Sequence, residues 1–157
     1  MKGNEVSPVR RTAVAERAAE QFRVWHGAEP GGVWYAPGRA NLIGEHTDYN
    51  EGWVLPFALD QSVVVAARRR GDGALDIRSR QAEGPVTVPL ATLRAGSVTG
   101  WAAYPAGVAW ALREAGHAVG GASLVIDSDL PQGAGLSSSA AIECATEIGR
   151  ASCRERV

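Results

Sequence analysis

The first regular pattern along the chain is a helical one near the amino terminus. Ser7-Pro8 has the order of a helix cap followed by a first helical residue. Apolar side chains then recur at helical spacing, at Val14, Ala18, Phe22 and Trp25. Gly27 closes the pattern, so we predict a helix between these two signals.

Short apolar runs rich in valine and leucine follow, and they predict strands. The expected strands cover, in order, residues 33–35, 52–59, 62–69, 75–79, 85–90 and 121–128. We expect 52–59 and 62–69 to pair with each other. The strict alternation in 75–79 indicates a half-exposed strand.

Two later segments have helical patterns. One covers residues 101–115, with Pro105 near its first turn and Gly116 at its end. The other begins at about Ser138. Antiparallel strands with helices added late in the chain argue for an α+β fold.

Composition excludes several classes of partner. The chain has 157 residues, the length of one ordinary domain, and a net charge of −1, which favours neither nucleic acid nor an anionic membrane as a partner. No run approaches the roughly 20 apolar residues of a membrane span, and the first residues lack the apolar stretch of a secretion signal. We therefore expect a cytoplasmic protein. The two cysteines have no metal or disulfide spacing, and we expect Cys144 to pack inside a helix interface.

Residues 37–50, PGRANLIGEHTDYN, concentrate hydrogen-bonding side chains around an apolar pair. We expect Leu42-Ile43 to be buried and the surrounding carboxylates, imidazole and amides to face a polar ligand. A sugar fits this set, because its hydroxyls both donate and accept hydrogen bonds. The alternative is a capped turn with Gly38 and Gly44 as breakers and Asp48 and Asn50 as turn formers.

Residues 130–141, LPQGAGLSSSAA, join a strand to a helix through a glycine-rich turn. Gly133 and Gly135 allow the backbone to approach a phosphate, and a helix start offers free N–H groups. The hydroxyls of residues 137–139 suit phosphate oxygens or a hydrated magnesium ion. Neither the lysine of the common mononucleotide loop nor three-glycine dinucleotide spacing is present. The alternative is a serine N-cap after a glycine turn.

Both motifs resemble those of one enzyme family. The first closely resembles the galactokinase signature and continues in register through residues 52–56. The second resembles the phosphate-binding loop of the superfamily that joins galactokinase with homoserine, mevalonate and phosphomevalonate kinases. Trp101-Ala102-Ala103-Tyr104 resembles a Trp-Ala-Asn-Tyr element of galactokinases. Ala103 and Ala40, where valine is expected, depart from the family pattern.

The resemblance implies an assignment for each site residue. Arg39 would lie near the transferred phosphoryl group, although a salt bridge with Glu45 or Asp48 is a compatible alternative. The residues assigned to the sugar hydroxyls are Glu45, His46, Thr47 and Asp48. The residues assigned to the nucleotide are Gly133, Ala134, Gly135, Leu136, Ser137, Ser138, Ser139 and, as a lesser candidate, Ser79. Ser139 would also bind the magnesium ion, and core packing is the favoured role of Trp101.

The resemblance also implies a domain organisation. Residues 1–146 would form part of the N-terminal domain of the galactokinase-type fold, a mixed sheet packed with helices, with the sugar motif at 37–50 and the phosphate loop at 131–141. The C-terminal domain would be absent. Gly149 interrupts the good helix formers after Ser138, and residues 147–157 match the translation of a common sequencing-adapter sequence. We interpret 147–157 as a non-native read-through tail; the alternative is a genuine basic tail.

The implied function is galactose phosphorylation at the anomeric hydroxyl by Mg-ATP, with the intact parent as a monomer. The family's catalytic aspartate and second magnesium ligand, a glutamate, lie downstream of the serine-rich loop, so we assign neither and expect this chain alone to be inactive. Other substrates, such as N-acetylgalactosamine or arabinose, remain open. A galactose- and ATP-binding sensor without turnover is another alternative, against which Ser139-Ala140 argues because such sensors can lack this pair. A truncated product with no function is a third.

Overall fold

The computed structural model describes residues 8–152 apart from 45, 48–49 and 132–135. Two short 3-10 turns, Leu90–Thr92 and Gly100–Ala102, precede the second helix. The main elements are α1 (Pro8–His26), β1 (Gly32–Ile43), β2 (Leu55–Arg70), β3 (Ala74–Ser79), β4 (Val86–Pro89), α2 (Ala103–Glu114), β5 (Gly121–Ser128) and α3 (Ser138–Ser152).

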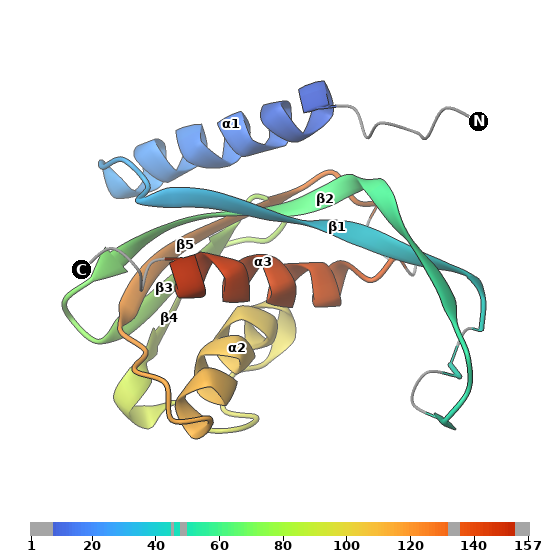
Figure 1. Ribbon diagram of the computed structural model, residues 1–157. Coiled ribbons are helices and arrows are strands. Elements are labelled where there is room, and N and C mark those ends of the chain that lie inside the picture. The colour runs from blue at the N-terminus through green and yellow to red at the C-terminus, as the bar shows by residue number, and fades with distance from the viewer. Residues whose placement is uncertain (1–7, 45, 48–49, 132–135, 153–157) are drawn as a thin grey trace.

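The five strands form one mixed sheet in the order β1-β2-β5-β3-β4. β3 and β5 are parallel, and the other neighbouring pairs are antiparallel. Helix α1 covers one face of the sheet, and α2 and α3 lie against the other (Figure 1). The expected α+β architecture, a mixed sheet packed with helices, is confirmed.

Alternating side chains of β2 build the core on both faces of the sheet. Val64 and Ala66 pack with α1, where the predicted positions Val14, Ala18 and Phe22 are buried. Val63 and Val65 point to the other face, into the larger cluster under α2 and α3. The predicted first helix is confirmed, and Gly27 ends it with a φ of 62°.

The predicted pair of strands over 52–59 and 62–69 is wrong, because residues 55–70 form one strand, β2, whose antiparallel partners are β1 on one side and β5 on the other. The register passes from Pro37–Ser62 to Arg39–Ala58, so residues 59–61 of β2 lie opposite Gly38 alone. An irregularity of this kind bends a strand pair and re-aims the side chains beside it. The polar residues 60–61 therefore mark a bulge within a strand rather than a turn.

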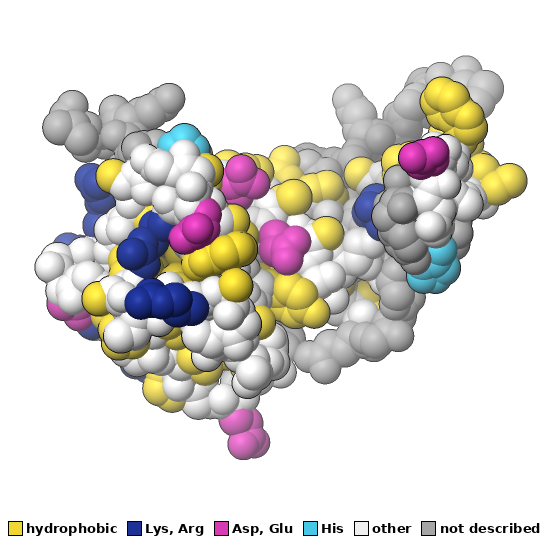
Figure 2. Space-filling model, turned by 90° about the horizontal axis from the view of Figure 1, so that it is seen from below, with side chains coloured by type: hydrophobic (Ala, Val, Ile, Leu, Met, Phe, Trp, Pro, Cys, Tyr) yellow, Lys and Arg dark blue, Asp and Glu magenta, His cyan; other side chains and the backbone are white. Residues whose placement is uncertain are grey.

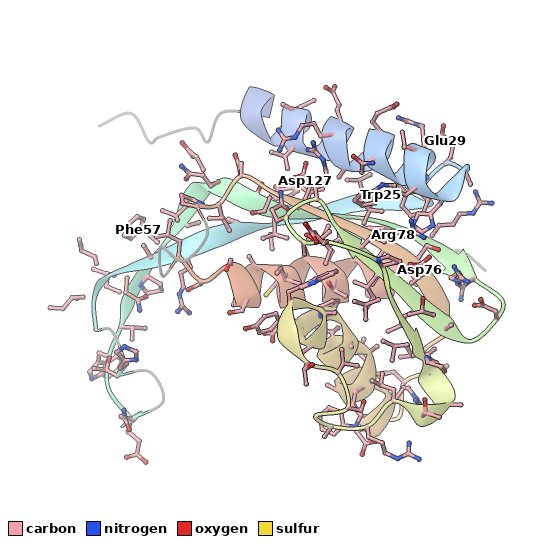
Figure 3. The ribbon with its side chains drawn as sticks, turned by 180° about the vertical axis from the view of Figure 1, so that it is seen from behind. Trp25, Glu29, Phe57, Asp76, Arg78 and Asp127 are labelled. Carbon is pink, nitrogen blue, oxygen red and sulfur yellow. The ribbon has the colours of Figure 1, made fainter. Side chains whose placement is uncertain are left out.

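Beyond this bulge the β1–β2 pair extends away from the body of the domain as an arm (Figure 1). Leu42 and Ile43 are 73% and 70% exposed, and Trp53 is 95% exposed. Phe57 also lies out on this arm (Figure 3). The expectation that Leu42-Ile43 is buried is wrong, because no other described element covers this part of the hairpin. Figure 2 shows the arm standing apart from the body on the face it presents.

Two further expectations about side chains are wrong. Strand β3 is mostly buried rather than half-exposed, because it lies between β5 and β4 and places Leu75 and Ile77 in the core. Cys144 is exposed, because Ala141 and Ala145 occupy the buried positions on α3.

Helix α3 also continues through Gly149, where the sequence predicted a break. Gly149 is buried, and a Cβ atom there would lie 3.0 Å from Cε3 of Trp34. The glycine thus gives the indole of β1 a place against the helix. Residues 153–157 lie outside the described residues.

Candidate functional site

Strand β1 carries the first motif directly past both ends of the second. Gly38 is buried, with the side chain of Leu130 and the carbonyl oxygen of Leu136 as its nearest neighbours. These two residues flank the glycine-rich turn. The structure thus brings the two motifs together at the start of α3.

Arg39 lies beside this contact. Its backbone N–H donates a hydrogen bond to the carbonyl oxygen of Leu136, 3.3 Å away. Its side chain is exposed and forms no ion pair with another described residue. Glu45 and Asp48, its alternative partners, lie outside the described residues. A guanidinium in this position is suited to meet the charge of a phosphoryl group.

The described part of the sugar motif after β1 forms a tight loop. Gly44 has a φ of 95°, and a Cβ atom there would lie 2.4 Å from the carbonyl oxygen of Trp53. The Thr47 hydroxyl lies 2.6 Å from the carbonyl oxygen of Gly44 and 2.9 Å from that of Trp53. A hydroxyl has one proton, so these carbonyls compete for it. Thr47 therefore fastens the loop, and its predicted contact with a sugar stays a prediction.

His46 lies in the same loop with an exposed side chain and a φ of 63°. A left-handed conformation is uncommon for a residue other than glycine and marks a backbone held by its surroundings. Here Asn50 Nδ2 donates to the carbonyl oxygen of His46 at 2.8 Å. The loop thus presents the imidazole to solvent, where a ligand could reach it.

The chain enters the phosphate loop through a turn that is tied to β2. Asp129 Oδ1 accepts the N–H of Ser62 at 2.8 Å. The Ser128 hydroxyl lies 3.2 Å from the carbonyl oxygen of Ser62 and accepts the N–H of Leu130 at 3.0 Å. Ser128 and Asp129 are not among the residues predicted from the sequence; the signal for them is two polar residues at the end of a buried strand, just before a glycine-rich turn.

The start of α3 offers groups that fit phosphate. Ser137 has a φ of 55°, and its carbonyl oxygen accepts the N–H of Ala141. The hydroxyls of Ser138 and Ser139 make no hydrogen bond to another described residue, and the first N–H groups of a helix have no partner within it. Hydroxyl and N–H donors at a helix start match the chemistry of phosphate oxygens. Gly133, Ala134 and Gly135 lie outside the described residues.

The described residues at the start of α3 supply only some of the ligands that a magnesium ion needs. The described part of the chain holds no cluster of three or more His, Cys, Asp or Glu side chains that could bind a metal ion. At nucleotide sites magnesium typically binds phosphate oxygens, water and one or two carboxylates, in some enzymes with a serine or threonine hydroxyl, so the hydroxyl of Ser139 could be one of its ligands.

Ser79 is the last residue of β3, at the same end of the sheet as the end of β5, because the two strands are parallel. It is buried, and its hydroxyl accepts the N–H of Gln81 at 3.1 Å. Gln81 Nε2 in turn donates to Asp127 Oδ1 at 2.8 Å. Ser79 is thus linked to the end of β5 that leads into the phosphate loop. Trp101 packs against the main core cluster, the role favoured for it from the sequence.

Asp127 is a fully buried carboxylate under α1 (Figure 3). Its Oδ2 lies 3.0 Å from Arg17 Nε of α1 and 3.0 Å from Arg80 Nη1. Burial acts to raise the pKa of Asp127, but the hydrogen bonds from Gln81, Arg80 and Arg17 outweigh it and hold the pKa below its ordinary value. The ionised carboxylate therefore fastens α1 to β5.

Among the described helices, none has the length and apolar character that crossing a bilayer requires.

Comparison with known proteins shows similarity along most of the chain. Residues 20–69 match the model of the galactokinase galactose-binding signature, and residues 103–152 match that of the GHMP kinases N-terminal domain. A galactokinase of Streptomyces coelicolor is 57% identical over 132 residues, which are 83% of this chain and 34% of that protein. A galactokinase of Mycobacterium tuberculosis is 56% identical over 107 residues, 68% of this chain and 29% of that protein.

Solved structures give the same result. The galactokinase of Lactococcus lactis complexed with galactose superimposes with a TM-score of 0.74 at 33% identity, over 83% of this chain and 35% of that one. The mevalonate kinase of Methanococcus jannaschii has a TM-score of 0.66 at 17% identity over 80% of this chain and 41% of that one, which shows the shared fold. The chain spans about a third of the length of the curated relatives it matches. With both motifs in place on this fold, the chain belongs to the galactokinase family.

Proposed function

We propose that the protein carrying this chain is a galactokinase, which transfers the γ-phosphoryl group of ATP to the anomeric hydroxyl of galactose. One observation carries the proposal: the backbone N–H of Arg39, a residue of the sugar motif on β1, donates to the carbonyl oxygen of Leu136, which comes directly before residues 137–139 at the start of α3. The strand that leads into the proposed sugar loop is thus hydrogen-bonded to the segment that leads into the proposed phosphate-binding helix start. The similar Lactococcus lactis protein was solved with galactose bound, which supports the choice of sugar.

In the proposed reaction the anomeric oxygen forms a bond to the γ-phosphorus while the bond to the β–γ bridging oxygen breaks and ADP leaves. The hydroxyl proton passes to a base, which we assign to no residue of this chain. Arg39 stabilises charge that spreads over the phosphoryl oxygens in the transition state. The proposed sugar contacts are Glu45, His46, Thr47 and Asp48.

The nucleotide phosphates would lie against the glycine-rich turn and the N–H groups at the start of α3. Residues 133–139 would hold them, and the Ser139 hydroxyl would be one ligand of the magnesium ion. When bound, that ion neutralises phosphate charge. Ser79 would act only through Gln81 and the end of β5, since its hydroxyl is engaged there.

We also propose the domain assignment made from the sequence. Residues 1–146 would be the native N-terminal part of a monomeric, cytoplasmic enzyme, and 147–157 a read-through tail. An independent read of the DNA beyond codon 146 tests the second point. Reads that continue with codons 147–157 would make the tail native.

An assay of the full-length protein tests the function. ADP release is measured with galactose, N-acetylgalactosamine and arabinose, and calorimetry measures galactose binding without ATP. We expect galactose-dependent turnover to exceed that with the other sugars. Turnover confined to another sugar would overturn the choice of substrate, and galactose binding without turnover would identify a sensor.

A further inference from the structure

Gly38 is a glycine because of its neighbours, not because of its own backbone conformation. Its φ is not in the left-handed region. A Cβ atom on it would lie 2.3 Å from Cδ2 and 3.3 Å from Cδ1 of Leu130, and 3.2 Å from the carbonyl oxygen of Leu136. Ordinary contacts of a Cβ atom begin at 3.4 Å, so a methyl group at residue 38 would have to displace the end of the Leu130 side chain and would press on the carbonyl oxygen of Leu136 by a few tenths of an ångström.

These neighbours are the two ends of the phosphate loop. Leu130 is buried, and its N–H is held by the Ser128 hydroxyl. The carbonyl oxygen of Leu136 accepts the N–H of Arg39. The next residue, Ser137, has a φ of 55°, in the left-handed region that residues other than glycine rarely adopt. A methyl group inserted at position 38 would displace the Leu130 side chain, which is buried and has little free space, and would press the carbonyl of Leu136 away from β1. That shift would separate Arg39 from the start of α3.

The sugar loop does not share this contact. It follows the end of β1, beyond a second register irregularity between Asn41 and Ile43. The hydrogen bonds of the Thr47 hydroxyl in this loop go to the carbonyl oxygens of Gly44 and Trp53, and neither involves Leu130 or Leu136. A disturbance at Gly38 is therefore directed to the nucleotide side of the site.

We propose that Gly38 is a positioning residue for phosphoryl transfer. Its missing side chain seats both ends of the phosphate loop on β1 and so fixes Arg39 relative to the serines of α3. Gly38 itself touches neither substrate. The effect of Gly38 on turnover rests on the proposed function. Its effect on the position of the phosphate loop does not, because it can be tested by measuring MgADP binding alone.

A volume-compensating pair of substitutions in the full-length protein tests the proposal. Gly38→Ala adds the clashing methyl group, and Leu130→Val removes both Cδ atoms that it meets. Gly107→Ala is the matched control, since a Cβ atom there meets nothing within 4 Å. Turnover, KM for MgATP and the calorimetric Kd values for galactose and MgADP are measured for each variant.

We expect Gly38→Ala to lower turnover on the order of 10–100-fold, as small misplacements of reacting groups do, with the galactose Kd changed less than about twofold. Leu130→Val added to Gly38→Ala should restore most of the turnover and of the MgADP affinity. Gly107→Ala should behave as wild type.

Two results would overturn the proposal: wild-type turnover and MgADP affinity in Gly38→Ala, or no recovery in the double variant. If Gly38→Ala fails to fold, the double variant decides, because it should fold and bind MgADP. If the wild type phosphorylates no sugar, the proposed function fails, and the MgADP affinities of the three variants still test the seating.

Discussion

The backbone N–H of Arg39 donates to the carbonyl oxygen of Leu136 at 3.3 Å, so the strand holds the phosphate loop independently of the arginine side chain. Replacing that side chain leaves this hydrogen bond in place. Substitutions at position 39 therefore isolate the effect of the guanidinium from the seating of the loop.

Arg39→Ala in the full-length protein should lower turnover by about 10²–10³, the usual loss for one electrostatic partner of a transition state. Galactose affinity should change little, because the guanidinium meets the phosphoryl group rather than the sugar. Steady-state kinetics and calorimetry with galactose measure the two effects. Arg69→Ala, an exposed arginine on β2, is the control. A turnover within about twofold of wild type would make Arg39 structural.

Gly44→Ala should weaken galactose binding, because its Cβ atom would lie 2.4 Å from the Trp53 carbonyl oxygen and open the sugar loop. The matched control is Gly73→Ala, since Gly73 also has a positive φ but its Cβ atom would meet nothing within 4 Å. Both substitutions carry the backbone strain of roughly 1–2 kcal/mol. Calorimetry should find a loss of galactose affinity in Gly44→Ala and none in Gly73→Ala. Equal galactose affinities in the two variants would show that the loop does not determine sugar binding.

Asp127→Ala should lower the free energy of unfolding by about 2–3 kcal/mol, somewhat less than the usual cost of breaking a buried ion pair, because the arginines left behind are partly exposed. Urea unfolding of the full-length protein measures the loss. Asp72→Ala, which breaks an exposed pair with Arg70, is the control and should have little effect. Equal losses in both variants would contradict the role given to the buried carboxylate.

The stability of the fold should fall as pH drops below 6.5. Burial lowers the pKa of His26 below its usual 6.5; Asp76 acts to raise it, and Arg78 and Arg70 act with burial. Below pH 6.5 the unfolded chain binds a proton that the folded chain resists, so stability is full above that pH and decreases until the folded pKa is reached. Urea midpoints at about pH 7.5 and about pH 5.5 measure the change.

His26→Gln should reduce this dependence on pH. The ring of His26 packs on Phe22, and its Nε2 has no hydrogen-bond partner within the described structure. Protonation of Nε2 therefore forms no new hydrogen bond that would stabilise the charged ring. An unchanged dependence in the variant would assign the effect to other groups.

The sequence predicted the elements whose signals are local. The apolar spacing from Val14 to Phe22 and the capping signals at both ends defined α1, and the continuous apolar run defined β5. The polar residues 60–61 have the local pattern of a turn, but they form a bulge opposite Gly38, and this depends on the partner strand, which local patterns do not contain. The exposure of Leu42 and Ile43 likewise depends on how far the hairpin extends from the sheet.

For the candidate site, too, the sequence predicted what depends on local residue types and not what depends on tertiary contacts. Residue types alone predicted roles for Arg39 and for residues 137–139, whereas the contact of Gly38 with Leu130 and Leu136 is a tertiary contact between segments far apart in the chain. Ser128 and Asp129 were missed because their hydrogen bonds reach back to Ser62 on another strand.

The place of β5 in the sheet has a consequence for synthesis of the chain. β5 lies between β2 and β3, so the β1–β2 pair and the β3–β4 pair can form from local contacts but cannot join until residues 121–128 have left the ribosome. Until then the valine-rich strand β2 and the strand β3, which carries Leu75 and Ile77, each expose an unpaired edge, the kind of edge that recruits neighbouring chains. β5 thus closes both edges in one step, and a ribosome that pauses before residue 121 holds a nascent chain whose exposed edges make it prone to aggregation.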